Sequence, residues 1–132
     1  MPSPIIASAF IWEGYAATCM ARILGNSGTA ITQASLTSIT YYVYDPQSAT
    51  PNTAIATGSV TISSAVSDTL VTNDARWRVD TTGRNFIYTI AGSAFPDPRR
   101  HYEAEFVFDP SAAGEENFLV KYELTTKATR TG

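Results

Sequence analysis

The segment between Tyr102 and Thr125 constrains the fold of this chain most strongly. Apolar residues alternate with polar ones on both sides of a Pro- and Gly-containing segment at 110–114. The apolar positions are Tyr102, Ala104, Phe106, Phe108, Phe118, Val120, Tyr122 and Leu124. Alternation of period two is typical of strands with one buried face, and the Pro/Gly segment between them indicates a turn. The sequence therefore predicts a β-hairpin here and a β-rich protein as a whole.

The charges on the polar face of this hairpin suggest its register. One register gives the pairs Phe106–Phe118, Glu103–Lys121 and His101–Glu123. The alternative, shifted by two residues, gives Glu105–Lys121 and Glu103–Glu123. Opposite charges directly across two strands contribute roughly 0.2–1 kcal/mol, whereas like charges repel. We therefore predict the first register.

The remainder of the chain predicts further short strands, about eight in all, and little helix. Strands are expected at 17–24 and 38–45, around Val60 and Ile62, and in a second hairpin over 76–90 that turns at 80–83. Gly58 is expected to be a bulge or break. Residues 25–28 form a strong turn signal, 30–36 are compatible with one helical turn, and 65–71 fit either a strand or a short helix.

Short strands separated by regular turn signals indicate an all-β sandwich or small barrel. We predict a single immunoglobulin-like β-sandwich, with a jelly roll as the runner-up. Tyr102 lies where a tyrosine often marks the start of the penultimate strand in this fold, although the Cys and Trp pattern of antibody domains is absent. The expected organisation is an N-terminal arm or first-strand extension at 1–15, the sandwich at 16–126 and a C-terminal tail at 127–132.

Composition excludes several classes of function. The 132 residues fit one domain, and the net charge is −3 with only two lysines, so no basic face for nucleic acid is visible. No apolar stretch is long enough for a membrane span, and the apolar start lacks the basic region of a signal peptide. The single cysteine, Cys19, suits a reducing compartment, so we expect synthesis in a cytoplasm.

Charged residues make up only 16% of the chain, against roughly 25% in typical soluble proteins. Thr, Ser and Ala replace the missing charge. A weakly charged surface favours association. The composition therefore fits either a plain Thr-rich β-protein or a protein whose surface is largely covered by partners.

No residue pattern requires a chemical reaction. Glu103 and Glu105 lie two positions apart on a strand, a spacing that glycosidase carboxylates tolerate, but both belong to the polar side of that strand. His101 is the only histidine, and Cys19 sits in an alternating strand where a small buried hydrophobe is expected. We find no nucleophile elbow, metal-ligand spacing, calcium loop or phosphate-binding loop. We therefore expect no catalytic residues, no metal and no cofactor.

A few residues are candidates for contacts with a partner instead. Tyr42 and Tyr44 share one face of a predicted strand, where they are able to stack on a sugar or anchor a protein interface. Phe10 and Trp12 lie in the N-terminal segment and fit either a core plug or an arm that reaches a neighbour. Arg99 and Arg100 form the one basic cluster, which sits at a loop end after two prolines.

The span from Gly28 to Thr125 resembles the small immunoglobulin-like proteins of tailed bacteriophage virions. The matching segments are 38–45 (SITYYVYD), 77–80 (WRVD), 83–86 (GRNF) and 102–108 (YEAEFVF). The resemblance implies a non-enzymatic structural role in a capsid, neck or tail, and it supplies no catalytic residues. The segment through Tyr15 lies outside it.

We therefore expect a virion structural protein made in the host cytoplasm. Its most specific form is a capsid decoration or cement protein, or a neck or tail accessory subunit. Its partners would be capsid or tail subunits of a large symmetric assembly, with itself as a homo-oligomer. Repetition in such a lattice multiplies weak contacts by avidity. The alternative is a carbohydrate-binding or adhesin module that uses exposed aromatic residues.

Overall fold

The computed structural model describes residues 5–12, 16–24, 30–75, 77, 81–97, 99–111 and 117–127, with backbone alone for 5–12, 118 and 127. The larger of its two sheets contains, in spatial order, β1 (Ile5–Trp12), β8 (Phe118–Lys127), β7 (His101–Pro110), β3 (Leu36–Tyr44) and β4 (Ala56–Ser59). The smaller contains β2 (Ala17–Ala21), β6 (Arg84–Ile90) and β5 (Val66–Val71). Neighbouring strands are antiparallel except β1, which runs parallel to β8.

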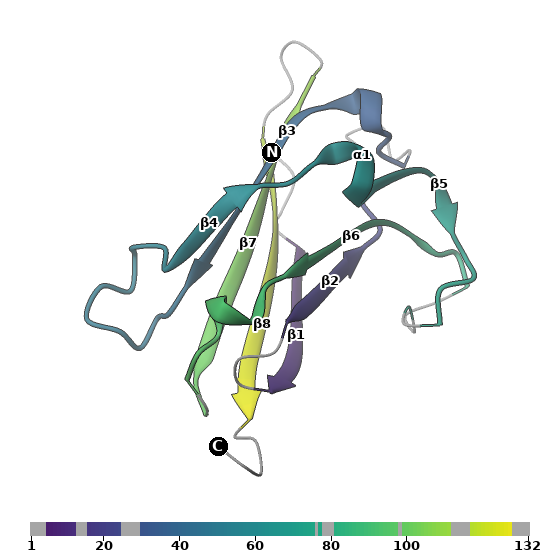
Figure 1. The fold of residues 1–132 in the computed structure, drawn as a ribbon. Coiled ribbons are helices and arrows are strands. Elements are labelled where there is room, and N and C mark those ends of the chain that lie inside the picture. The colour runs from purple at the N-terminus through teal and green to yellow at the C-terminus, as the bar shows by residue number, and fades with distance from the viewer. Residues whose placement is uncertain are drawn as a thin grey trace.

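Three short helical turns complete the described secondary structure: η1 (Gln33–Ser35), α1 (Ile62–Ala65) and η2 (Gly92–Ala94). Figure 1 shows β7 and β8 as the long central strands of the larger sheet, with β2, β6 and β5 in the second layer. Within the described residues, no helix is both long enough and apolar enough to cross a bilayer.

The strand order confirms an all-β sandwich of the immunoglobulin type. In that fold one sheet carries strands G, F and C, with C′ added in variable-type domains, and the other carries B, E and D. The order β8-β7-β3-β4 against β2-β6-β5 reproduces this plan in both sheets. Sheets of five and three strands in this arrangement fit the immunoglobulin plan rather than the jelly roll.

Tyr102 forms the corner that the sequence predicts for this fold. Its side chain is fully buried, and its Oη accepts a hydrogen bond from the backbone N–H of Asp97 at 3.1 Å. The ring packs edge-on against Phe95, with centroids 5.5 Å apart. In antibody domains the second cysteine follows two residues after this tyrosine, and here that position is Ala104. Cys19 on β2 therefore has no disulfide partner on β7, and the two sheets are joined in this region by packing and by the hydrogen bond that the Tyr122 hydroxyl on β8 donates to the carbonyl of Met20 on β2, at 2.7 Å.

The C-terminal hairpin is confirmed, with its alternating residues buried as predicted. Tyr102, Ala104, Phe106 and Phe108 of β7 and Val120, Tyr122 and Leu124 of β8 all face the core. Phe106 is the centre of the aromatic packing, and four rings lie within 6.2 Å of its own, measured between centroids: Tyr41, Phe86, Tyr88 and Tyr122. Rings from both sheets therefore meet at one side chain.

The predicted register of this hairpin is wrong by two residues. The observed pairs include Phe106–Val120, Phe108–Phe118, Glu105–Lys121, Glu103–Glu123 and His101–Thr125. Shifting by two residues keeps every side chain on its own face, so burial does not distinguish the two registers. The charges do not distinguish them either, because Lys121 reaches Glu103 diagonally, with Nζ 3.2 Å from Oε2. This ion pair offsets the repulsion that the prediction assigned to the observed register.

Other strand predictions are confirmed in part. β3 overlaps the strand expected at 38–45, and η1 occupies the predicted helical turn. β2 begins where expected but ends at Ala21, three residues before the predicted end at 24. The strand expected around Val60 and Ile62 is shorter, because β4 ends at Ser59 and Ile62 begins α1. The ambiguous segment at 65–71 contains the last residue of α1 and all of β5. The second arm of the predicted 76–90 hairpin is present as β6, but β6 lies between β2 and β5 and pairs with Val71 at Arg84, so the predicted hairpin pairing is wrong. The turn at 25–28 and, apart from Trp77, residues 76–80 lie outside the described residues.

At two positions the structure shows why the residue is glycine. Gly58 continues β4 opposite Tyr41 rather than breaking it, and a Cβ there would lie 2.8 Å from Cε1 of that ring. The expected bulge or break is therefore absent from β4, and the glycine instead makes room for the ring of Tyr41. Gly83 has φ +97°, and a Cβ there would lie 2.4 Å from the carbonyl oxygen of Val71. Only glycine fits both the positive φ and this contact.

Candidate functional site

The surface of the larger sheet that faces away from the smaller one carries the candidate functional residues. We call it the outer face, and it comprises alternate residues of three adjacent strands. These are Thr40, Tyr42 and Tyr44 of β3; His101, Glu103, Glu105 and Val107 of β7; and Leu119, Lys121, Glu123 and Thr125 of β8. All of them are partly exposed. The inner residues of the same strands fill the core, so this alternation leaves the polar and aromatic side chains open to a partner or ligand.

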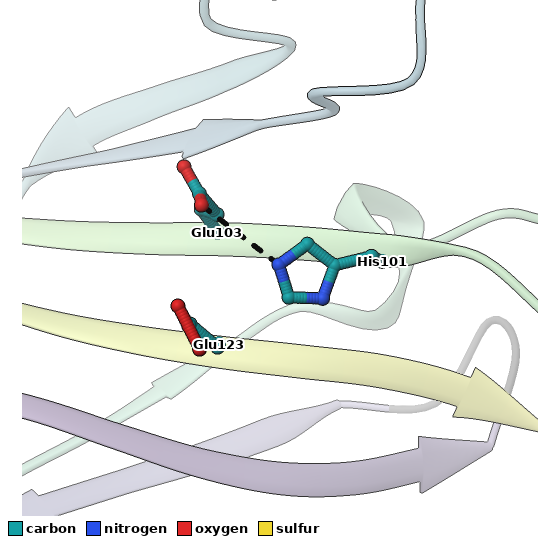
Figure 2. A group of neighbouring side chains, drawn as sticks. All are labelled: His101, Glu103 and Glu123. Atoms are coloured by element: carbon teal, nitrogen blue, oxygen red, sulfur yellow. Dashed lines mark ion pairs between the residues drawn. The ribbon is translucent and has the colours of Figure 1, made fainter.

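A compact group of ionisable side chains lies at one end of this face (Figure 2). His101 and Glu103 project from β7, and Glu123 projects from β8 directly opposite Glu103. One nitrogen or oxygen of each residue lies within 4.8 Å of the others. The Nε2 of His101 is 3.8 Å from Oε2 of Glu103, the oxygen that also faces the ammonium of Lys121. The outer face thus places an imidazole, two carboxylates and an ammonium together.

A shallow depression of about 230 Å³ adjoins this group. Tyr44, Glu103 and Glu105 line it from the sheet, and Pro51 and Asn52 line it from the loop between β3 and β4. Both carboxylates that the sequence singles out therefore line one concavity. Glu103 is already engaged with Lys121, and every lining residue except Pro51 is polar. A carboxylic acid that donates a proton near neutral pH usually sits in an apolar pocket, which this depression does not provide.

Tyr42 and Tyr44 stack on each other beside this depression. Their ring centroids are 6.3 Å apart, and the ring planes differ by 22°. Burial raises the pKa of the Tyr44 hydroxyl above its usual value, and the charge of Glu105 and the neighbouring Tyr42 raise it further. The hydroxyl therefore keeps its proton at neutral pH and is able to donate a hydrogen bond. Together the two rings form a partly exposed aromatic surface with a polar edge.

Of the two arginines in the basic cluster, only Arg100 makes a side-chain ion pair with a described residue. Arg100 donates from Nε to both carboxylate oxygens of the buried Asp45, at 2.9 and 3.2 Å. It therefore fixes the loop before β7 to the end of β3. Arg99 is exposed and has a left-handed backbone, with φ 54°, while its N–H donates to the carbonyl of Thr126. Of the two arginines, Arg99 is the one presented to solvent.

The two aromatic residues of the N-terminal segment belong to β1. In the parallel pairing of β1 with β8, Phe10 is the partner of Thr125 and Trp12 is the partner of Lys127. Residues 5–12 thus form an edge strand of the larger sheet beside the outer-face residues of β8. Their side chains lie outside the described part of the structure.

Cys19 is the small buried hydrophobe that the sequence predicts. It is 2% exposed, and burial raises the pKa of its thiol to about 12. Because the nucleophile in cysteine chemistry is the thiolate, a thiol that keeps its proton in the core is inert. Cys19 is buried in the core, whereas His101 projects from the outer face of β7, so the structure does not bring these two residues together as a catalytic pair.

The predicted register already placed Glu123 opposite His101, on the face that carries Glu103. The observed register places Glu123 opposite Glu103 instead and keeps all three side chains together. The sequence did not indicate that these three residues form a group with the ligand types of a metal site. The lining residues Pro51 and Asn52 carry no comparable signal, since a loop with two prolines predicts no particular contact.

Comparison with known proteins adds no functional assignment. No family model, curated protein or solved structure matches the chain. The resemblance to phage virion proteins therefore remains a prediction.

Proposed function

We propose that this protein is a non-enzymatic structural subunit that acts through protein–protein contacts made by the outer face. The observation that carries the proposal is the stacked Tyr42–Tyr44 pair on an open sheet surface. Tyrosine is enriched in interfaces because it offers a large apolar ring with a polar end at little cost in side-chain entropy. A β-sandwich whose open face carries such a pair is suited to binding.

The most specific form of this proposal is an accessory protein of a tailed-phage virion, as capsid decoration or cement or as part of the neck or tail. Its support is the resemblance of 28–125 together with the low content of charged residues, 16%. Each copy then needs only a modest contact, because repetition across a symmetric lattice supplies avidity. Homo-oligomeric contacts between neighbouring copies fit the same arrangement.

The proposal predicts a very large native assembly. Light scattering and electron microscopy of the assembly from which the chain is isolated should give a particle of megadalton mass that carries many copies. A monomer or dimer that never associates with such particles would contradict the virion role. It would also favour a binding module that works alone.

Truncating the aromatic pair should weaken this association. Replacing Tyr42 and Tyr44 together with alanine should lower the affinity at least about tenfold, because interface tyrosines commonly act as hot spots. The measurement is the number of copies retained per particle after sedimentation. The control is Leu24→Ala. Leu24 is 49% exposed and follows β2, a strand of the smaller sheet, so it lies away from the outer face. If both variants were retained equally, the interface would lie outside the outer face.

A carbohydrate-binding module is the second candidate, and the depression beside Tyr44 favours it. Ligand sites are usually concave, with a few polar groups that fix orientation, and Asn52, Glu103 and Glu105 supply such groups here. A glycan array, followed by titration of any hit, separates the two functions. Loss of a sugar signal in Tyr44→Ala would support the module. Absence of binding to any sugar class would leave the structural role.

A further inference from the structure

Two carboxylates on β7 and β8 lie directly across the strands from each other, and the single ammonium of Lys121 offsets their repulsion only in part. Glu103 and Glu123 are direct cross-strand partners, and like charges in that position destabilise a sheet. Lys121 supplies one ammonium, and it contacts Glu103. The side-chain carboxylate of Glu123 makes no ion pair or hydrogen bond with another described residue. Among the described residues, the group therefore has more negative than positive charge, and the carboxylate of Glu123 has no partner there.

The third member supplies the chemistry that points to a particular cation. His101 brings a ring nitrogen to within 4.8 Å of a carboxylate oxygen from each glutamate (Figure 2). Zn²⁺ takes imidazole nitrogen and carboxylate oxygen as ligands at about 2.0–2.2 Å, often three from the protein with one position left open. Ca²⁺ takes six to eight oxygens, and Mg²⁺ binds through oxygens while keeping several waters. An imidazole with two carboxylates therefore favours zinc.

We propose that His101, Glu103 and Glu123 form a Zn²⁺-binding site on the outer face. In a tetrahedral site with these bond lengths, neighbouring ligand atoms lie roughly 3.4 Å apart. The Nε2 of His101 and Oε2 of Glu103 are now 3.8 Å apart, and no pair in the group exceeds 4.8 Å. Rotation of partly exposed side chains closes these gaps, because the β7–β8 ladder already holds the three backbone positions in register.

Lys121 is the competitor of the metal at this site. Its Nζ lies 3.2 Å from Oε2 of Glu103, and its positive charge repels a divalent cation. At a separation of about 5 Å in water, the repulsion between the Lys121 ammonium and Zn²⁺ is large enough to weaken zinc binding on the order of tenfold. Zinc binding therefore displaces the ammonium from Glu103. Removing the charge by Lys121→Met should strengthen zinc binding about tenfold, a result that a merely structural group of charges does not produce.

The chain offers a direct readout because His101 is its only histidine. In tag-free protein, ZnCl₂ should shift the imidazole resonances of this one residue, and isothermal titration should give one site per chain. MgCl₂ and CaCl₂ at the same concentrations should leave these resonances in place. Zinc at 100 times its dissociation constant should also raise the melting temperature by about 5–10 °C, because it binds the folded state.

Variants identify the ligands. His101→Asn, Glu103→Gln and Glu123→Gln should each weaken zinc binding at least about tenfold, since even outer-shell partners of metal sites matter 10–100-fold. The matched control is Glu105→Gln, which removes the same charge from the same face of β7 without removing a ligand. Its effect should stay below about threefold, the range of a screened charge effect.

Several results would overturn the site. One is the absence of saturable binding below about 1 mM zinc, the weak end of the affinity scale. Another is binding that persists unchanged in Glu123→Gln and His101→Asn, which would place the metal elsewhere. Equal shifts of the histidine resonances by calcium would contradict the assignment to zinc. Because these substitutions replace partly exposed side chains, circular dichroism should show that each variant remains folded.

Discussion

Replacing Phe106 with alanine should lower the free energy of unfolding by about 3–5 kcal/mol. Phe106 is fully buried on β7, between the two sheets. Its ring centroid lies 5.1 Å from that of Phe86 and 5.8 Å from that of Tyr122, so the substitution opens a cavity between rings that come from both sheets. Because domains of this size are stable by only about 5–15 kcal/mol, such a loss removes a large part of the margin.

Urea denaturation followed by circular dichroism gives the measurement. Val107→Ala is the matched control, since Val107 is the next residue on β7 and is partly exposed on the outer face. It should cost less than about 1 kcal/mol. Phe106→Leu, which retains most of the apolar volume, should fall between the two. If Phe106→Ala and Val107→Ala cost the same, the aromatic packing around Phe106 does not hold the sheets together.

This packing explains why the fold class could be predicted from sequence. The alternation on β7 and β8 determines which side chains enter the core. A slip of one residue would turn the apolar side chains to solvent, so only one of the two faces of each strand can be buried. The same argument located β2 and β3. Tyr102 added a specific sign of the immunoglobulin arrangement, and its hydrogen bond to the backbone of Asp97 is present.

The register and the outer face could not be predicted in the same way. A shift of two residues leaves the core pattern unchanged, so only the charges remained to decide between the two registers. Those charges are on long side chains that reach diagonal neighbours, as Lys121 reaches Glu103. The energy difference between the registers is therefore set by packing along the whole sheet, in which β7 also pairs with β3.

Helix α1 shows a similar limit. Ile62 continues an apolar alternation with Val60, yet it begins a helical turn. It still packs against the core, as the pattern requires. The pattern thus identified a core contact but not the backbone conformation that makes it, because a short segment obeys the contacts around it rather than its own propensity.

Asn85 is a second residue whose importance the sequence does not reveal, and its replacement by alanine should cost about 3–5 kcal/mol. The side chain is fully buried on β6. Its Oδ1 accepts from the N–H of Ile23 at 2.7 Å, and its Nδ2 donates to the carbonyls of Ile23 and Ile31 at 2.9 and 3.1 Å. Asn85 thereby joins β6 to the segments before and after residues 25–29.

The size of this effect follows from the groups left behind. The carbonyl of Ile23 retains a bond from the N–H of Ile31 at 3.0 Å. The N–H of Ile23 and the carbonyl of Ile31 lose the partners that Asn85 provides. Each buried polar group without a partner costs about 1–3 kcal/mol, and the cavity left by the side chain adds to this. Thr89→Ala, an exposed change on the same strand, should cost less than about 1 kcal/mol.

The variant Asn85→Asp separates loss of the hydrogen bonds from loss of volume. It keeps the shape and the acceptor but buries a carboxyl group whose pKa is raised by desolvation. A group with a raised pKa in the folded state holds its proton more tightly in that state. The stability of the protein therefore falls as the pH rises from the pKa of the unfolded state through that of the folded state. The free energy of unfolding of Asn85→Asp should therefore be higher at pH 4 than at pH 7, relative to the unsubstituted protein at each pH. An equal cost at both pH values would show that water reaches position 85, in conflict with its complete burial.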